Sequence, residues 1–346
     1  MLIGNVSYYM KLQNSFKHEF RNKKILITGG TGSIGIGLIK QLLQYKPKII
    51  KVFTNDENSI FESIRKFGKN PLIDYEMGDV RDKDRLDFVI RGIDIVFHAA
   101  AMKHVDICED NPFDAVKTNV VGTSNIIESS ISAKISKFIL ISTDKATLPS
   151  TTLGASKLLA ERLTINANAY NDSGKTVFAI VRFGNVIGSR GSVYQIFLDQ
   201  IRKNQSPTVT DPRMSRFIMS IQDAAGLILK ATNMCKGGEI FILKMPSVKI
   251  KDLAENMVKV CAGSDYKKSN KIKVSKSREH ERFHEYLVTP EEIPFCHNLD
   301  DMYKISKVRN KKVLSQKEFS SETAKKMNEG KLRNVIKELR EEFLPF

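Results

Sequence analysis

The chain has 346 residues, of which 55 are Lys or Arg and 39 are Asp or Glu, so its formal charge is +16. Hydrophobic residues make up 41% of it, which excludes a disordered chain and is enough for a real core. No run approaches the roughly 18 apolar residues of a membrane span, and the first 20 residues lack the apolar stretch of a signal peptide. We therefore expect a cytoplasmic protein with no membrane partner. The charge alone leaves open a nucleic acid, a membrane surface, an acidic substrate or no specific partner.

The order of apolar runs along the chain predicts alternating strands and helices. Strands are expected at 23–30, 48–54, 72–79, 93–100, 136–143 and 176–184. Helices are expected at 36–45, 81–90, 111–131 and 151–171. This alternation is typical of βαβ units, and the nearly continuous apolar strands indicate a parallel sheet that is covered on both faces.

Beyond residue 190 the periodicity is weaker. Two short strands are expected at 239–243 and 271–274 with a helix at 249–261 between them, and the charged, helical tail has Val335, Leu339 and Phe343 on one face. The expected organisation is an N-terminal arm (1–22), a dinucleotide-binding domain to which later segments return (23–190), a substrate-binding region (191–312) and a helical tail (313–346).

A glycine-rich loop, TGGTGSIG at 28–35, follows the first strand and opens the first helix. Its glycines permit a tight turn, close approach of a pyrophosphate and close helix–strand packing, while the helix N-terminus offers amides to phosphate. The expected cofactor contacts are Gly29, Thr31, Gly32, Ser33, Ile34 and Gly35. Because a strand–turn–helix context surrounds the loop, the fold class predicted is α/β, a Rossmann-type doubly wound parallel sheet with a small C-terminal α/β substrate-binding region.

The ends of the second and third strands carry acids that suit the adenosine half of a dinucleotide. Asp56 lies where an acid contacts the adenosine ribose of NAD. An Arg in this segment would favour NADP, and residues 53–57 contain none. The alternative is that Asp56 caps the next helix. Asp79, with Val80 beside it, is expected against the adenine, or else is a turn aspartate. The cofactor is therefore NAD or NADP.

The four cysteines, Cys108, Cys235, Cys261 and Cys296, are widely scattered and show no metal-ligand spacing. We expect reduced thiols and no metal site.

Six motifs together resemble the extended short-chain dehydrogenase/reductase superfamily. They are TGGTGSIG, GDVRD, HAAAMKHVDICEDNPFDAVKTNVVGT, STDKA, GASK and RFGNVIGSRGSV. Within that superfamily the chain is similar, from about residue 23 to 290, to the CapD-like polysaccharide-biosynthesis group of UDP-N-acetylglucosamine 4,6-dehydratases and related epimerases. The resemblance implies a nucleotide-sugar substrate, a tightly bound NAD or NADP and a homo-oligomer.

The implied reaction is an internal redox sequence in which sugar C4 is oxidised, water is lost across C5–C6, and hydride returns to C6. The resemblance implies that Thr143 contacts the reacting sugar oxygen, that Asp144 is the acid and that Lys145 is the base. A base lysine must lose its proton near neutral pH, so we expect its pKa to be lowered by burial or a positive neighbour. The alternative is an exposed charge pair on a loop.

GASK ends at Lys157, which the resemblance places among the catalytic groups and on the nicotinamide ribose. Superfamily members carry Tyr four residues earlier, where this chain has Leu153. Leu153 cannot accept a proton, so the hypothesis is that Lys145, or a water held by Thr143, takes the proton of the C4 hydroxyl. The alternative is a protein that binds the cofactor without turnover.

Small side chains and cations follow the fourth strand. Ala99 and Ala100 are expected to let the cofactor lie close to the backbone, and Lys103 is expected to contact the substrate. His104 reaches the same region or is a structural histidine.

Further substrate contacts come from the second half of the chain. The resemblance assigns Asn185 to the substrate diphosphate and Arg216 to a segment that closes over the nucleotide, and Arg190 offers donors suited to phosphate. Arg278 is a further diphosphate candidate, although the Pro-Gly turn that relatives have there is missing. Glu281 and His284 nearby suit the site or an ordinary surface.

The function expected is that of a UDP-N-acetylglucosamine 4,6-dehydratase, a lyase for surface polysaccharide or glycan biosynthesis. The alternatives are a C4 epimerase of the same substrate class and a non-catalytic dinucleotide-binding protein. A nucleic-acid partner is not expected, because the basic residues are spread among acids rather than clustered with aromatic residues.

Overall fold

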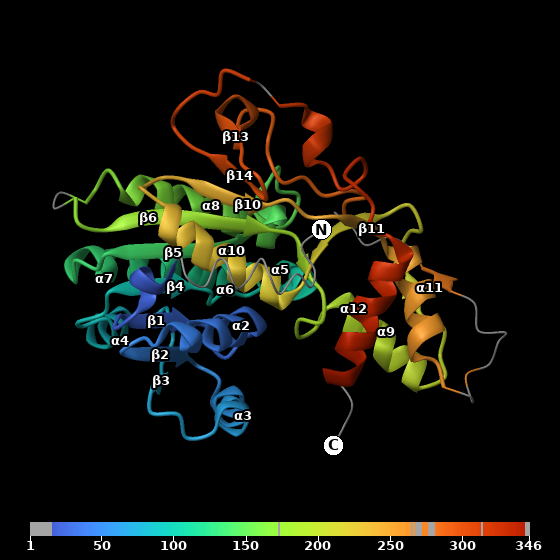
Figure 1. Cartoon of the computed structure of the whole chain (residues 1–346), viewed down its shortest axis with the longest axis horizontal. Helices are drawn as coiled ribbons and strands as arrows, with labels where there is room; N and C mark the ends of the chain where they lie inside the picture. The colour runs from blue at the N-terminus through green and yellow to red at the C-terminus, as the bar shows by residue number, and fades with distance from the viewer. Residues whose placement is uncertain are drawn as a thin grey trace.

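One open sheet organises the molecule (Figure 1). The computed structural model describes residues 16–171, 174–263, 266, 272–275, 281–312 and 314–342. Within these residues the sheet has nine strands, in the spatial order β3 (Ile73–Met77), β2 (Ile49–Thr54), β1 (Lys24–Thr28), β4 (Ile95–His98), β5 (Lys137–Thr143), β6 (Val177–Phe183), β10 (Ile240–Leu243), β14 (Met302–Ile305) and β13 (Cys296–Asn298). Strands from β3 to β10 are parallel, and β14 and β13 add an antiparallel edge. The predicted Rossmann-type sheet is confirmed.

Helices cover both faces of the sheet. The helix α2 (Ser33–Leu42) packs against α10 (Ile221–Met234) on one face, and α4 (Lys83–Val89), α7 (Gly122–Ser132) and α8 (Thr152–Ala167) pack together on the other (Figure 1). The helix α3 (Glu57–Phe67), which follows β2, was expected only as the helix that Asp56 would cap, without a predicted range. The short elements are η1 (Leu43–Tyr45), α5 (Val105–Asp110), α6 (Pro112–Val116), η2 (Lys117–Val121), η3 (Asp144–Ala146), η4 (Ile293–Phe295) and η5 (Gln316–Phe319).

A second hydrophobic cluster lies beside the main core and is built from later parts of the chain. Its helices are α9 (Val193–Arg202), α11 (Ile250–Cys261) and α12 (Glu329–Glu342). Small sheets accompany them, formed by β11 (Ser247–Lys249), β9 (Ser215–Met219) and β7 (Asn185–Val186), and by β12 (Lys273–Val274) and β8 (Thr208–Val209). These elements stand to one side of the large sheet in Figure 1.

Four expectations need correction or completion. The single helix predicted over 111–131 is interrupted by the π-helical turn η2, and the strand predicted at 271–274 is only the two residues of β12. The helix of the tail begins at Glu329 rather than near 313, with Val335 buried, while Phe343 lies outside the described residues. Of the N-terminal arm, residues 16–20 are helical, and residues 1–15 lie outside the described part.

The main core contains one buried histidine whose charge state affects stability. The ring of His98 makes two hydrogen bonds, from Nδ1 with Thr28 Oγ1 (2.7 Å) and from Nε2 with Thr123 Oγ1 (3.0 Å). Burial, helped by Lys157, lowers its pKa from 6.5 to about 3, so the folded protein holds it neutral. In the unfolded chain His98 binds a proton below pH 6.5, whereas in the folded protein it does not. The contribution of His98 to folding stability is therefore fully present above pH 6.5 and is lost as the pH falls towards 3.

We therefore expect His98→Gln to flatten the pH dependence of unfolding. Between pH 6.5 and 4.5 the wild type should lose up to about 1.4 kcal/mol per pH unit more than the variant. Urea unfolding at several pH values measures this difference. Parallel stability curves for the two proteins would show that His98 does not titrate on unfolding as described.

Candidate active site

The glycine-rich loop is held close to the loop that follows β4. Gly29 has φ +64°, and a Cβ on it would lie 2.7 Å from the backbone nitrogen of Ala100. Ala99 and Ala100 therefore border the loop, and their closeness to the cofactor stays a prediction. Gly32 is the N-cap of α2 and provides no side-chain hydrogen bond to the first turn. A helix N-terminus without a capping side chain, set beside glycine backbone, fits a pyrophosphate.

Replacing Gly29 by Ala should weaken the binding of NAD or NADP by roughly a hundredfold, because the added Cβ forces the loop to move by an ångström or so. Isothermal titration calorimetry with each cofactor measures the loss. The matched control is Gly68→Ala, since Gly68 has nearly the same φ, +66°, but no atom within 4 Å of an added Cβ. Equal affinities for the two variants would show that the loop does not hold the dinucleotide.

A chain of hydroxyl groups connects the glycine-rich loop to the end of β2. Ser59 donates to Thr31 Oγ1 (2.7 Å), and Thr31 donates to Thr54 Oγ1 (3.2 Å). Asp56 accepts from the backbone nitrogen of Ser59 (3.1 Å), so it caps α3 as the alternative interpretation had it. Its contact with a ribose stays a prediction.

Asp79 adopts the geometry of a turn aspartate. It accepts from the backbone and guanidinium of Arg81, at 2.7–3.0 Å, and from Asn55 Nδ2 (3.0 Å). The hydrogen bonds of Arg81 hold the pKa of Asp79 below its ordinary value. Val80 is buried against Gly122 on α7. The placement of Asp79 and Val80 on the adenine stays a prediction.

Thr143, Asp144 and Lys145 lie together at the carboxyl end of β5, as the sequence predicts. Thr143 Oγ1 donates to Asp144 Oδ1 (3.0 Å), and Lys145 Nζ lies 3.2 Å from the same oxygen. Asp144 is fully buried, and its Oδ2 has no hydrogen-bond partner among the described residues. Burial raises the pKa of this carboxyl against the opposing charge of Lys145. Asp144 is therefore suited to hold a proton, and it is not part of an exposed charge pair.

The expectation that the pKa of Lys145 is lowered is wrong for this arrangement. Burial works to lower its pKa, but Asp144 and Glu285 outweigh burial and raise that pKa above its ordinary value. The reason is a second carboxylate, since Glu285 Oε1 also lies 3.2 Å from Lys145 Nζ. Any role as a base therefore requires Lys145 to give up a stabilised proton first.

Lys157 and Leu153 lie one helical turn apart on α8. Lys157 Nζ donates to the carbonyl of Ile141 (2.8 Å), and burial lowers its pKa to about 8 despite the nearby Glu161. Leu153 is buried against Cys108 and other apolar side chains. Leu153 therefore fills the position of the usual Tyr with hydrocarbon.

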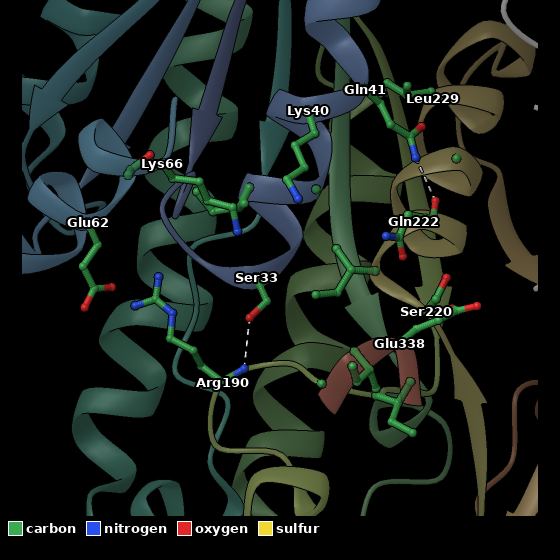
Figure 2. A pocket seen from close by; sticks show the side chains of 18 of the residues that line it. Ser33, Lys40, Gln41, Glu62, Lys66, Arg190, Ser220, Gln222, Leu229 and Glu338 are labelled. Carbon is green, nitrogen blue, oxygen red and sulfur yellow. Dashed lines mark hydrogen bonds between the residues drawn. The ribbon is translucent and has the colours of Figure 1, made fainter. Parts of the chain in front are cut away.

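Arg190 lies on the glycine-rich loop. Its backbone nitrogen donates to Ser33 Oγ (3.0 Å; Figure 2). Its guanidinium donates to the carbonyl of Thr31. Lys103 Nζ in turn donates to the carbonyl of Arg190, and burial together with Arg190 lowers the pKa of Lys103. This placement puts Arg190 beside the predicted cofactor phosphates, and the sequence alone did not indicate it. The role of Arg190 and Lys103 on the substrate stays a prediction.

Asn119, which the sequence reasoning missed, holds the loop that carries Lys103. It accepts from the backbone nitrogen of Met102 (2.8 Å) and donates to the carbonyl of the same residue (3.1 Å). Asn119 lies in the π-helical turn η2, a type of irregularity that often marks functional sites. A π-turn gives no signal in hydrophobic periodicity, so the sequence predicted one regular helix here.

The other predicted substrate residues fall into three situations. Asn185 is at the start of β7, and its buried Oδ1 has no partner within the described ranges. Arg216 is buried and turned inward, where it donates to the carbonyls of Ser215 (2.9 Å) and Phe283 (3.1 Å). Arg278 lies outside the described residues.

A cavity of about 1030 Å³ lies along the outer side of α2, between α3, α10 and α12 (Figure 2). It reaches Ser33 and Arg190 at the glycine-rich loop but none of the residues at the end of β5. The catalytic candidates therefore lie outside this cavity. Over the described part of the chain no cluster of His, Cys, Asp or Glu has the arrangement of a metal site, and no helix is long and apolar enough to cross a bilayer.

Comparisons with known proteins find relatives that match nearly the whole chain. An uncharacterized membrane protein of Methanocaldococcus jannaschii is 47% identical over 92% of this chain and 97% of its own length. A UDP-glucose 4-epimerase of Rickettsia bellii is 35% identical over 92% of this chain and 96% of its own length. The crystal structure of Pen from Bacillus thuringiensis is 41% identical, with a TM-score of 0.86 over 92% of this chain and 98% of that one. The family model described as polysaccharide biosynthesis protein matches residues 25–307, and the chain therefore belongs to that family.

Proposed function

We propose that this protein is a nucleotide-sugar 4,6-dehydratase that acts on UDP-N-acetylglucosamine for the biosynthesis of a surface polysaccharide or glycan. The observation that carries the proposal is the pairing of Asp144 with Lys145 at the carboxyl end of β5, where ligands bind in open α/β sheets. The reaction converts the substrate into its 4-keto-6-deoxy form and one molecule of water.

Elimination across C5–C6 requires both an acid and a base. The C5–H bond breaks and its proton goes to the base, while the C6–O bond breaks and the leaving hydroxyl takes a proton from the acid. Asp144, whose pKa is raised by burial, is suited to supply the proton to the leaving oxygen. Lys145 is the candidate that accepts the C5 proton and later returns one. A C4 epimerase needs neither transfer.

The glycine-rich loop, the uncapped start of α2 and the small Ala99 and Ala100 fit a nicotinamide dinucleotide. When bound, it supplies reversible hydride acceptance at C4 and hydride donation at C6. Lys157 is proposed to bind the nicotinamide ribose, and its lowered pKa brings its titration close to neutral pH. Substrate contacts are assigned to Lys103, Asn185, Arg190, Arg216 and Arg278.

Leu153 sets a requirement on the first proton transfer. With no phenol on α8 at this position, Lys145, or a water held by Thr143, is proposed to take the proton of the C4 hydroxyl. If Lys145 takes it, that proton passes to water before Lys145 accepts the C5 proton. Thr143 Oγ1 already lies within hydrogen-bond distance of Asp144, so the three side chains form one connected set.

The second candidate function is C4 epimerisation of a UDP-hexose or UDP-N-acetylhexosamine. It is favoured by the 35% identical relative that is named UDP-glucose 4-epimerase. A non-catalytic dinucleotide-binding protein is the third candidate, favoured by Leu153 alone.

Liquid chromatography coupled to mass spectrometry, after incubation with several UDP- and GDP-sugars, separates these functions, because it resolves isomers by elution and dehydrated products by mass. We expect a product of UDP-N-acetylglucosamine that has lost one water. An isomer of unchanged mass would identify an epimerase. Unchanged substrate in every case, with no transient absorbance at 340 nm in stopped flow, would identify a protein without turnover.

A further inference from the structure

Glu285 is a buried carboxylate that comes from a distant part of the chain. It lies in the irregular stretch before Leu287, yet it is only 4% exposed. Its backbone nitrogen donates to Ser321 Oγ (2.9 Å), and the backbone nitrogen of Ser321 donates to its carbonyl (2.9 Å). These two bonds fix the backbone of Glu285, and its carboxylate lies beside Lys145 at the end of β5.

The carboxylate of Glu285 lies between two cations. Its Oε1 is 3.2 Å from Lys145 Nζ and 3.8 Å from Arg216 Nε. Burial works to raise the pKa of Glu285, but Lys145, Arg216 and Arg282 lower it below its ordinary value, so the group is an anion. A buried anion this close to an ammonium group is a strong electrostatic partner, because little water screens the pair.

The surroundings of Lys145 show what Glu285 adds. The charged groups that face this pair are Asp144, Arg216 and Arg282, with Glu281 bound to the far side of Arg216 at 3.3 Å. Asp144 also raises the pKa of Lys145, although burial raises its own pKa. Without Glu285, Asp144 alone would oppose burial and Arg216, which both lower the pKa of Lys145. About a quarter of the Lys145 side chain is exposed, which leaves its amine a way to the substrate.

We propose that Glu285 is a positioning residue for the dehydration, which holds the Lys145 amine against Asp144 and stabilises by charge the ammonium that forms when Lys145 takes the C5 proton. This inference rests on the proposed function for its role in turnover. Its effect on Lys145 is independent of turnover. Charge that develops in the transition state is stabilised most by groups already fixed in place, and the two hydrogen bonds to Ser321 fix Glu285.

The test compares Glu285→Gln with Glu281→Gln. Gln keeps the shape and removes the charge, and Glu281 contacts Arg216 but not Lys145, so it is the matched control. Protein labelled with ¹³C at the lysine Cε is titrated by NMR, with the Lys145 signal assigned from Lys145→Met. We expect the pKa of Lys145 to fall by about one to two units in Glu285→Gln and to stay unchanged in Glu281→Gln.

The kinetic readout is the pH profile of kcat with UDP-N-acetylglucosamine. In Glu285→Gln the rise of kcat with pH should move to lower pH by the same amount, while the maximal kcat falls several-fold because a weaker base removes the C5 proton. A merely structural role would lower kcat without moving the profile. An unchanged Lys145 pKa in Glu285→Gln would overturn the proposal.

Two further results are interpretable. If Glu285→Gln does not fold, Glu285→Asp keeps the charge but draws it back from Lys145, and a partial fall of the Lys145 pKa is expected in its place; no fall overturns the proposal. If no nucleotide sugar is turned over by the wild type, the proposed function fails, while the NMR titration still decides whether Glu285 controls Lys145.

Discussion

Asp144→Asn should lower the rate of 4,6-dehydration by about a hundred- to ten-thousandfold, the range typical of loss of general acid catalysis. Asn keeps the size of the side chain and its acceptor for Thr143 and Lys145, but it cannot donate an acidic proton to the leaving C6 oxygen. Oxidation at C4 does not need this proton. We therefore expect absorbance at 340 nm to persist on mixing the variant with UDP-N-acetylglucosamine, while the dehydrated product fails to accumulate.

The control for this prediction is Asp114→Asn. Asp114 is an exposed aspartate whose contact, with Arg81 at 3.5 Å, lies outside the proposed acid–base set. The Asp114→Asn variant should form the dehydrated product at the wild-type rate, as measured by liquid chromatography. A rate for Asp144→Asn within threefold of the wild type would exclude Asp144 as the acid.

Arg182→Met should destabilise the fold by about 3–5 kcal/mol, because it leaves the buried carboxylate of Glu161 and the partly buried carboxylate of Glu292 without their cation. Arg182 is 1% exposed and donates to both oxygens of Glu161 (3.0 and 2.6 Å) and of Glu292 (2.8 and 2.9 Å). It also donates to the carbonyl of Leu287 (2.9 Å), two residues from Glu285. The network therefore joins β6, α8 and the segment that carries Glu285, and urea unfolding followed by circular dichroism measures the loss.

Arg213→Met provides the comparison for Arg182→Met. Arg213 makes a similar two-point contact with Asp211, but it is fully exposed, so its removal should leave the free energy of unfolding unchanged. Adding Glu161→Gln and Glu292→Gln to Arg182→Met should restore part of the lost stability, since no buried charge then remains unpaired. Equal unfolding midpoints for Arg182→Met and the wild type would contradict the account.

The sequence predicted the parallel part of the sheet well, because all of its strands except β3 are apolar runs that are visible on their own, and β3 alternates apolar and polar residues. It did not predict α9, α10 or the antiparallel pair of β13 and β14. That pair depends on the match of β14 with β10, a long-range contact that no local pattern encodes. The π-helical turn at Lys117–Val121 was missed for a similar reason, since it serves the contact of Asn119 with Met102.

The candidate site was predictable where one motif carries it and not where tertiary contacts decide. TGGTGSIG and STDKA each lie at the end of a strand, so their positions followed from the strands. The charge state of Lys145 did not follow, because it depends on Glu285 far along the chain. Arg190 has donors suited to phosphate at any location, and only the folded loop places it on Thr31 and Ser33.

Proton NMR of the product formed from UDP-N-acetylglucosamine in deuterated water tests the central claim most directly. If Asp144 and Lys145 carry out the elimination, the C6 hydroxymethyl signals disappear and a methyl signal replaces them. That methyl signal is a singlet, because Lys145 returns a solvent-derived deuteron to C5. A product without a methyl group, with an inverted configuration at C4 and hydrogen retained at C5, would contradict the account and establish epimerisation instead.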